Sequence, residues 1–403
     1  MGSMKASLPA RPPGYSEADL SKDLLTQRAN NMASKAYLAY GVIIGLVVII
    51  LLGFVIDIRN DSENGILSPI IGGGTRLLTN GDSFKLAPPK ATACKPQQNI
   101  VFIKTHKTAS TTAASIFDNF AVRNNLSVAI PQDRQPYMHR TKLFHRDMMA
   151  NTPQSVGDGE EGRVSVNIFS SHARYNRLEM DAVVPDAKYV TVLRDPASQF
   201  VSAFVFFHFD ERLRRKFDRD GRRYKNVLEE FLNDPEKNFK LLEDHPLRHV
   251  IHNQQFFDLG LNTDFSDDPD AVDAAIARLD EEMDLVLITE HFDESLILMR
   301  KVLCWDTADI FYVRKMVHNT TQAFTATRAM RRKIRRWNAA DVQLYDHFNR
   351  TLWRRIAEYG PTFEDELSEF RKRLKNVTKE QVKSHRHVVL AMADKMNIPP
   401  KRK

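Results

Sequence analysis

Short apolar runs alternate with longer stretches of helical periodicity along the chain from residue 99 onward. The short runs cover 100–103, 164–172, 188–193 and 284–290, and they predict strands. Apolar residues spaced three and four apart predict helices over 113–121, 196–209, 293–303, 323–335, 338–358 and 364–385. Because parallel strands need helical crossovers, this alternation predicts an α/β fold with a mostly parallel sheet flanked by helices.

A different apolar pattern occupies residues 36–56. This stretch carries no charge and is long enough to cross a bilayer as a helix. It is longer and starts later than the apolar part of a signal peptide. Lys22, Arg28 and Lys35 precede it, and the positive-inside rule then places the N-terminus in the cytoplasm. The pattern predicts a single transmembrane helix in a type II protein, with the rest of the chain lumenal.

These patterns divide the chain into five segments. Residues 1–35 are polar and predict a cytoplasmic tail, followed by the signal-anchor helix 36–56. Residues 57–95 are rich in Gly, Ser, Asn, Pro and Thr, which predicts a flexible lumenal stem. We expect the main folded domain over 96–365, and a charged C-terminal helix and tail over 366–403.

The overall charge narrows the partners only slightly. A formal net charge of +7 suits an anionic ligand or a membrane surface. The sequence has neither the cysteine and histidine spacing of a zinc finger nor a long basic block, so no motif indicates nucleic-acid binding. The two cysteines, Cys94 and Cys304, are too few for a disulfide scaffold or a multi-cysteine metal site. In an oxidising compartment they are either bridged or free, and the sequence leaves both open.

The most informative polar stretch lies between the first predicted strand and the first predicted helix. It reads KTHKTAST over 104–111, and no glycine occurs between Asn99 and Phe120, so it is not a G-x-x-x-x-G-K-[ST] loop. The first turn of a helix leaves backbone N–H groups free, and the helix dipole favours an anion there. Two lysines and a row of hydroxyls belong to the same corner. The stretch therefore predicts a phosphate- or sulfate-binding loop.

A second anion-binding pattern follows the strand predicted over 188–193. The segment RDPASQFVS begins with Arg194, whose guanidinium is a planar fork suited to phosphate. Asp195 suits the N-cap of a helix and Pro196 suits its first position. Ser202 comes two turns into that helix, where its hydroxyl can face the same point as Arg194.

Together the two motifs resemble the sulfotransferases that use 3′-phosphoadenosine-5′-phosphosulfate. In the Golgi carbohydrate enzymes of that group, a lysine followed by T-A/G-S-S/T comes directly after the first strand, and an R-[DN]-P-x5-S segment binds the 3′-phosphate. Three further segments closely resemble the galactose 3-O-sulfotransferases, which include the galactosylceramide sulfotransferases: NQQFFDLG (253–260), EHFDESLILMRKVLCW (290–305) and WNAADVQLYDHFN (337–349). The resemblance covers roughly residues 97–355.

This resemblance implies the P-loop-like sulfotransferase fold, 3′-phosphoadenosine-5′-phosphosulfate as co-substrate, no metal, and a galactose-terminated glycolipid or glycoprotein as acceptor. Lys107 matches the catalytic lysine that donates to the leaving oxygen. The cofactor-binding positions that it implies are Lys104, Thr108, Ala109, Ser110, Thr111, Thr112, Arg194 and Ser202. The match gives Lys104, which begins the loop, no catalytic part.

A general base should accept the proton of the acceptor hydroxyl, and His172 has the best position among the histidines. It follows one predicted strand and precedes the strand that leads to Arg194, and ligands of open α/β sheets bind at the carboxyl ends of strands. The segment HARY (172–175) also resembles an H-x-x-[YF] segment of related carbohydrate sulfotransferases. His106 and His208 are the competing candidates.

Other functions stay open at this point. A type II glycosyltransferase would use a D-x-D pair and manganese, and Asp218-x-Asp220 and Asp268-x-Asp270 have that form, although both lie in charge-rich loops. A uronyl or heparan 2-O-sulfotransferase shares the K-T-A-S-T loop. A membrane-anchored glycan-binding protein without activity could keep the same fold.

The expected location is the Golgi membrane, with the folded domain in the lumen. This expectation rests on the predicted topology and on the resemblance alone, since the sequence shows no recognisable Golgi-targeting motif. N-x-S/T sequons give weak support, since they are used only on the lumenal side; they begin at Asn60, Asn125, Asn319, Asn349 and Asn376.

Overall fold

The computed structural model describes residues 94–135, 137–150, 166–313, 326–378 and 381–399. The predicted tail 1–35, the predicted span 36–56 and nearly all of the stem lie outside these residues. Within the described ranges, no helix combines the length and the apolar character needed to cross a bilayer. The segment boundaries drawn from the sequence therefore stay predictions.

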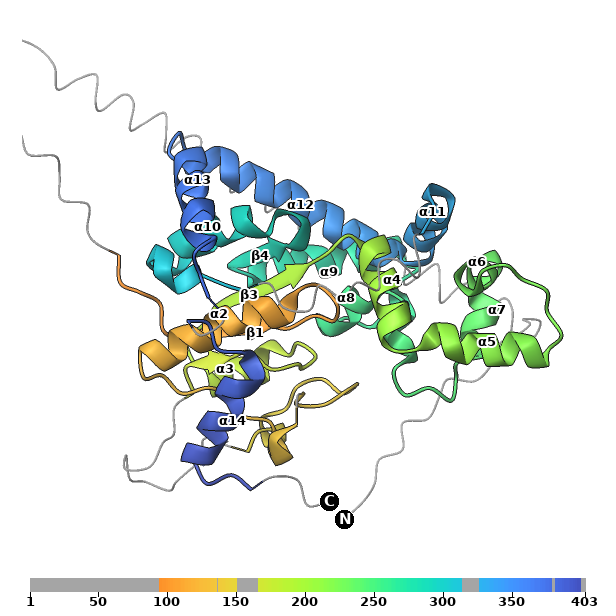
Figure 1. Ribbon diagram of the computed structural model, residues 1–403, viewed down its shortest axis with the longest axis horizontal. Coiled ribbons are helices and arrows are strands. Elements are labelled where there is room, and N and C mark those ends of the chain that lie inside the picture. Colours follow the sequence, from red (N-terminus) through yellow and green to blue (C-terminus); the bar gives the residue numbers. More distant parts are fainter. Residues whose placement is uncertain (1–93, 136, 151–165, 314–325, 379–380, 400–403) are drawn as a thin grey trace, which may run out of the picture. The chain divides into compact units, whose positions relative to one another are not determined.

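Four parallel strands form the sheet, in the order β2-β1-β3-β4. Their bounds are Ile100–Ile103 for β1, Ile168–Phe169 for β2, Lys188–Leu193 for β3 and Leu285–Ile288 for β4. The prediction of an α/β fold with a parallel sheet is confirmed for the described part of the chain (Figure 1). Only two residues of the strand predicted over 164–172 are in β2.

Helices surround the sheet and connect its strands (Figure 1). The longer ones are α2 (Ser110–Arg123), α4 (Pro196–Phe206), α5 (Phe209–Arg219), α9 (Pro269–Glu282), α10 (Phe292–Leu303), α11 (Arg328–Trp337), α12 (Ala339–Tyr359), α13 (Phe363–Leu374) and α14 (His385–Lys395). The short ones are α3 (Arg177–Val183), α6 (Val227–Asn233), α7 (Pro235–Lys240) and α8 (Gln254–Asp258). Single 3₁₀ turns are η1 (Gln132–Arg134), η2 (Arg146–Met148), η3 (Arg248–Ile251), η4 (Thr263–Phe265), η5 (Thr289–His291) and η6 (Thr307–Ile310).

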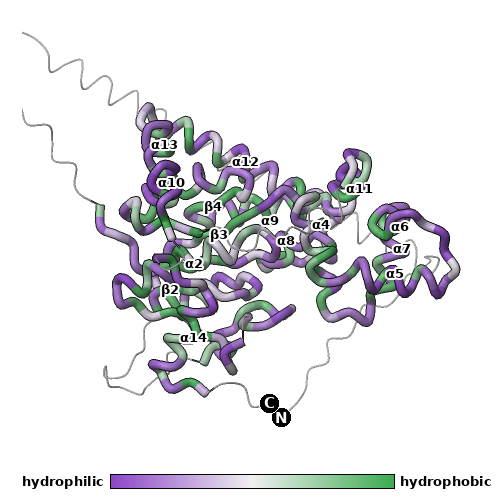
Figure 2. Tube along the Cα trace, viewed as in Figure 1, coloured by the Kyte–Doolittle hydropathy of each residue, from purple (hydrophilic) through white to green (hydrophobic). Residues whose placement is uncertain are grey.

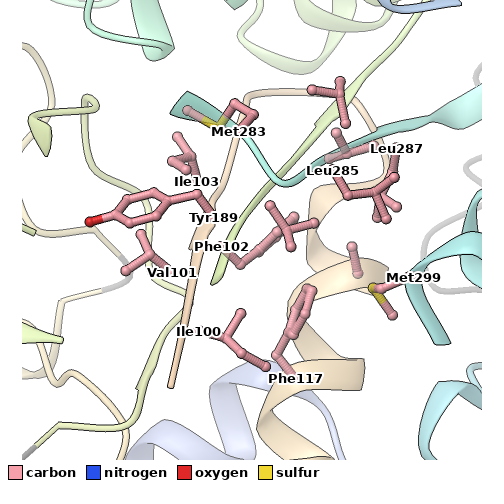
Figure 3. Close-up of a cluster of buried hydrophobic side chains, with 14 of the residues drawn as sticks. Ile100, Val101, Phe102, Ile103, Phe117, Tyr189, Met283, Leu285, Leu287 and Met299 are labelled. Carbon is pink, nitrogen blue, oxygen red and sulfur yellow. The ribbon is translucent and has the colours of Figure 1, made fainter. Parts of the chain in front are cut away.

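The main core lies between the sheet and the helices that follow its strands. All four residues of β1 are fully buried, and the ring of Phe102 stacks on Phe117 of α2 with centroids 4.9 Å apart (Figure 3). Leu287 of β4 and Met299 of α10 belong to the same cluster. Because both faces of β1 are covered, its sequence is a continuous apolar run rather than an alternating one. This burial holds the end of β1, and the loop that follows it, in one place.

A second apolar cluster joins α4 to α5, α6 and α11. Phe200 and Phe204 of α4 contact Phe231 of α6, and Met330 and Ile334 of α11 are buried in the same cluster. In Figure 2 the outward parts of these helices have hydrophilic colours, as expected for amphipathic helices at the edge of a domain. The cluster fixes α11 against the helix that begins after Arg194.

The C-terminal region corrects one sequence prediction. The single helix expected over 364–385 is wrong, because α13 ends at Leu374 and α14 begins only at His385. A turn follows α13, in which the amide of Val377 donates to the carbonyl of Leu374. The last helix, α14, packs on α2 (Figure 1), and the His385 ring lies 2.6 Å from the Asp118 carboxylate, which is fully buried.

The two cysteines that the sequence left open form a disulfide. Cys94 is bonded to Cys304, the C-cap residue that directly follows α10. Beside it, the indole of Trp305 donates to the carbonyl of Gln97 at 2.9 Å, and the Gln97 amide donates to the carbonyl of Leu303. The chain that enters β1 is thereby attached to the end of α10.

Candidate active site

The loop between β1 and α2 has the backbone of an anion-binding concavity. Lys107 and Ala109 adopt left-handed φ angles of 62° and 61°, which residues with a side chain seldom do. Such strain persists where the surroundings enforce it, often at ligand clamps. Within the described part of the chain, the amides of residues 107–111 have no hydrogen-bond acceptor. Successive free N–H groups in this conformation favour an anion.

Hydroxyl groups of the loop and its neighbours hold that shape. The Thr105 hydroxyl donates to the carbonyl of Val192 in β3 and lies 2.6 Å from the Thr108 hydroxyl. The Ser110 hydroxyl donates to the carbonyl of Thr105. Thr289, directly after β4, donates to the carbonyl of Thr108 at 2.8 Å. Thr108 and Ser110 thus shape the loop with their hydroxyls, and it is their backbone amides that stay available.

The remaining predicted positions of the loop differ in exposure. Ala109 and Thr111 are exposed at the start of α2, whereas Thr112 is buried. Ala109 is the N-cap of α2, and its carbonyl accepts from the Thr112 amide. Helix α2 begins at Ser110, within the loop predicted over 104–111, and its first amides are open.

The two lysines of the loop have different surroundings. Lys104 is almost completely buried, and this burial lowers its pKa to about 8, although the Asp118 carboxylate acts in the opposite direction. Lys107 is partly exposed, and burial together with the charge of Arg194 lowers its pKa to about 8. The ammonium of Lys107 lies 3.6 Å from the centroid of the Phe206 ring, a cation–π contact that holds it at the end of α4.

The second predicted motif meets the loop directly. The guanidinium of Arg194 donates to the carbonyl of Lys107 at 3.0 Å. Asp195 caps α4 by accepting from the Ser198 amide, and Pro196 is the first residue of the helix, as predicted. Ser202 lies in the second turn of α4 and is half-buried. The structure therefore brings together the two segments that the sequence placed about ninety residues apart.

His172 lies beside the start of the loop and follows the neighbouring strand. Its Nδ1 is 3.0 Å from the carbonyl of Lys104, and since a carbonyl only accepts, Nδ1 carries the proton. The neutral ring then has its lone pair on Nε2. Burial, and next the nearby His106 and Lys104, lower the pKa of His172 well below its usual range. An unprotonated ring is what a general base requires.

Three neighbouring parallel strands deliver these groups to one edge of the sheet. Lys107 follows β1, Arg194 follows β3, and His172 follows β2, which flanks β1 on the other side. The carboxyl ends of adjacent parallel strands form the crevice in which open α/β sheets bind ligands.

Comparison with known proteins identifies the family. The profile of the galactose-3-O-sulfotransferase family matches residues 27–396, which is most of the chain. The chain belongs to the galactose-3-O-sulfotransferase family.

Several curated members of the galactose-3-O-sulfotransferase family are close enough to align over long stretches. Mouse galactosylceramide sulfotransferase is 34% identical over 67% of this chain and 60% of its own length. Galactose-3-O-sulfotransferase 3 is 34% identical in mouse and 33% identical in human, over 76% of this chain and 70% of each relative. A solved sulfotransferase from Alicyclobacillus acidocaldarius matches with a TM-score of 0.32 and 16% identity, covering 63% of this chain and 95% of that one.

The structure gives a role to family segments whose roles sequence reasoning did not find. In the segment 253–260, the side-chain amide of Gln255 pairs with both backbone groups of Arg194, at 2.8 and 3.0 Å. One turn later, the Asp258 carboxylate accepts from the backbone amide of His106 at 2.7 Å and lies 2.9 Å from its ring Nδ1. Helix α8 therefore connects the loop to the Arg194 segment. The polar residues on either side of Phe256 and Phe257 in this segment were the only sequence signal.

The segment 337–349 holds α8 in turn. The Asp341 carboxylate accepts from the amides of Gln255 and Phe256 at the start of α8. The side chain of Asn338 accepts from the amide of Asn253, which precedes them. Burial raises the pKa of Asp341 to about 7, against the two amide hydrogen bonds that lower it.

The competing histidines have distinct places. The ring of His106 stacks on that of His172, with centroids 4.3 Å apart, and is held by Asp258. His208 is exposed and begins α5. The D-x-D pairs are used locally: Asp268 caps α9 and Asp218 accepts from the Tyr224 hydroxyl. Among the described residues, no group of three or more His, Cys, Asp or Glu has the arrangement of a metal site.

Proposed function

We propose that this protein transfers the sulfuryl group of 3′-phosphoadenosine-5′-phosphosulfate to the 3-hydroxyl of galactose on a glycolipid or glycoprotein. The observation that carries the proposal is the convergence of Lys107, Arg194 and His172 at the ends of three adjacent strands. The curated relatives include sulfotransferases named for galactose and for galactosylceramide.

The residues of the site fit an anionic nucleotide. The open amides of residues 107–111 suit a 5′-phosphate, and Lys104 and Lys107 add positive charge to the same loop. Arg194 and Ser202 suit a second phosphate farther along α4. The bound co-substrate would supply an activated sulfuryl group with a phosphate leaving group. Side chains of the protein would accept the proton of the acceptor hydroxyl and stabilise the leaving oxygen.

His172 is suited to accept the proton of the acceptor hydroxyl. Its Nε2 lone pair is available because Nδ1–H donates to the carbonyl of Lys104. The pKa of His172 lies well below 6.5 because of burial, so the ring is neutral at neutral pH. The ring of His106, stacked on one face and anchored by Asp258, fixes its orientation.

Lys107 is suited to donate a proton or a hydrogen bond to the leaving oxygen. A pKa of about 8 keeps its ammonium mostly charged at neutral pH and makes it a better acid than an ordinary lysine. The contact with Phe206 and the neighbouring Arg194 place this ammonium on the α4 side of the loop. Transfer then depends on positioning and electrostatics, as in phosphoryl transfer.

The membrane arrangement belongs to the same proposal. We place the protein in the Golgi membrane as a single-pass type II protein, with the described domain in the lumen. The charge-free stretch 36–56 and the basic residues before it support this arrangement. The Cys94–Cys304 disulfide agrees with an oxidising compartment.

The decisive experiment supplies labelled co-substrate together with different acceptors. We expect label transfer to a β-galactoside, none to heparan, and no change when a chelator is added. Transfer to heparan would favour the alternative hypothesis of a uronyl or heparan 2-O-sulfotransferase. Transfer to no acceptor, with nucleotide binding retained, would favour a glycan-binding protein. In a parallel reaction that supplies a labelled sugar nucleotide instead, chelator-sensitive transfer of the sugar would favour a glycosyltransferase.

A further inference from the structure

Three polar residues that follow Arg194 share one face at the start of α4. Asp195, Ser198 and Ser202 are spaced three and four apart, so their side chains lie one above the other. Ser198 therefore lies one turn before Ser202, the residue predicted to contact the 3′-phosphate. A donor that reaches Ser198 therefore lies about one helical turn from Ser202.

Arg331 of α11 reaches this face from a distant part of the chain. Its Nη2 donates to the Asp195 carboxylate at 2.6 Å and to the Ser198 hydroxyl at 3.2 Å. On either side of it along α11, Met330 and Ile334 are buried in the apolar cluster around α4. The backbone that carries Arg331 is therefore fixed relative to α4 before any ligand binds.

Several N–H donors of Arg331 and Arg194 have no acceptor among the described residues. Within the described residues, Arg331 donates only through Nη2, which leaves Nε and Nη1, and its side chain is 43% exposed. One N–H of the Arg194 guanidinium already donates to the carbonyl of Lys107. A phosphate monoester has three strongly accepting oxygens, and each of them can accept more than one hydrogen bond, so it has room for donors beyond Arg194 and Ser202.

The charges at this corner point to the same ligand. Burial lowers the pKa of the Arg194 guanidinium and the charge of Arg331 adds to this effect, whereas Glu290 and Asp195 raise it. The Asp195 carboxylate offsets part of the repulsion between the two guanidinium groups, and a phosphate dianion would offset the rest.

We propose that Arg331 is a third anchor of the 3′-phosphate of the nucleotide, together with Arg194 and Ser202. This inference rests on the proposed function, because it assigns a residue to the same nucleotide. The planar fork of Arg331 binds the phosphate through the N–H groups that Asp195 and Ser198 leave open, while Asp195 holds the guanidinium in place.

The test compares two nucleotides that differ only in the 3′-phosphate. Calorimetry on the full chain in detergent micelles measures the affinity for adenosine 3′,5′-bisphosphate and for adenosine 5′-phosphate. We expect Arg331→Gln to weaken binding of the bisphosphate by about tenfold to a hundredfold and to leave binding of the 5′-phosphate nearly unchanged. Arg331→Lys, which keeps the charge but loses the fork, should fall in between.

Arg335 is the matched control. It lies one turn later on α11 and donates to the same Asp195 carboxylate at 3.0 Å, but its other partner is Asp346 and it does not contact Ser198. Arg335→Gln should keep the affinity ratio of the two nucleotides within about twofold of that of the wild type, because it leaves the 3′-phosphate contacts in place.

The outcomes separate this inference from the proposed function. Equal weakening of both nucleotides in Arg331→Gln would mean a structural role, and unchanged affinity for both would mean no contact. Either result overturns the inference, while turnover of a galactoside by the wild type would still support the proposed function. If Arg194→Ala also fails to discriminate between the two nucleotides, the assignment of the whole segment to the 3′-phosphate is wrong, whereas the proposed function is judged by turnover of a galactoside.

Discussion

At the scale of single residues, the site depends on two groups whose proton affinities differ from their ordinary values for the same reason. Burial disfavours charge, so it keeps His172 neutral and brings the pKa of Lys107 down to about 8. A neutral imidazole and a charged ammonium therefore coexist at neutral pH, as the proposed roles of base and acid require. Activity should fall at low pH, when His172 becomes protonated, and again at high pH, when Lys107 loses its proton.

The alkaline side of the pH profile should identify the acid. Lys104 and Lys107 both have a pKa of about 8, so wild-type activity should decline near that pH whichever lysine is responsible. Lys107→Arg keeps the charge, because a guanidinium stays protonated at far higher pH than an ammonium, and we expect the decline to move upward by more than about two pH units. Lys107→Ala should abolish turnover in a folded protein.

Lys104 is the comparison for this experiment. Lys104→Gln should keep the decline near pH 8, because the ammonium of Lys107 remains. If the decline instead disappears in Lys104→Gln and persists in Lys107→Arg, the acid has been assigned to the wrong lysine.

The acidic side of the profile tests His172. His172→Gln should lower kcat by about 10²–10⁴-fold, keep the affinity for adenosine 3′,5′-bisphosphate, and remove the decline at low pH. The matched variant His208→Gln changes an exposed histidine at the start of α5 and should leave the profile unaltered. A near-normal rate with an unchanged acidic decline in His172→Gln would move the role to another residue, with His106 the nearest candidate.

At the scale of elements, one short helix joins the two halves of the proposed nucleotide site. Helix α8 presents Gln255 to the backbone of Arg194 and Asp258 to His106, and Asp341 of α12 caps its first turn. Residues three apart on a helix share a face, so this single face reaches both segments. The geometry of the site therefore depends on residues that need not touch the nucleotide.

Asp258→Asn should show this dependence. An amide has one accepting oxygen where the carboxylate has two, so one of the two contacts to His106 loses its acceptor. We expect the free energy of unfolding to drop by about 1.5–3 kcal/mol in denaturant titrations, with weaker nucleotide binding by calorimetry. Asp264→Asn, in the exposed turn η4, should change neither quantity. If Asp258→Asn and the wild type have the same free energy of unfolding and the same nucleotide affinity, α8 does not hold the site in place.

At the scale of the whole molecule, topology decides which sequons can carry a glycan. Asn125 and Asn376 are exposed at turns after α2 and α13. Asn349 lies within α12, and its side-chain oxygen is enclosed without a hydrogen-bond partner among the described residues. Asn60 and Asn319 lie outside the described residues.

Enzymatic deglycosylation of the protein from secretory cells should therefore reduce its apparent mass. Asn125→Gln and Asn376→Gln should each remove part of that shift, because both side chains are accessible to the glycosylating enzyme. Asn349→Gln should leave the shift as it is. A lumenal domain would be contradicted by the absence of any shift, together with protease cleavage of the C-terminal region in intact vesicles.

The sequence alone determined the elements and the chemistry that follows directly after them. Buried strands read as apolar runs, so β1, β3 and β4 were predicted close to their observed positions, and the loop and Arg194 were recognisable because each follows a strand. The N-cap at Asp195 was predicted for a similar reason, since capping depends on neighbours within one turn. Local patterns suffice wherever the partners are a few residues apart.

Only the tertiary structure decided the contacts between distant segments. The hydrogen bonds from α8 to the loop and to Arg194, the reach of Arg331 to Ser198, and the Cys94–Cys304 bridge all join residues whose spacing in the sequence carries no signal. The break between α13 and α14 was missed because the helical pattern of the sequence continues through the turn that separates them. Helix α14 packs on α2, which lies far from it in the sequence. Burial, which sets the proton affinities of Lys107 and His172, likewise depends on what the rest of the chain packs around them.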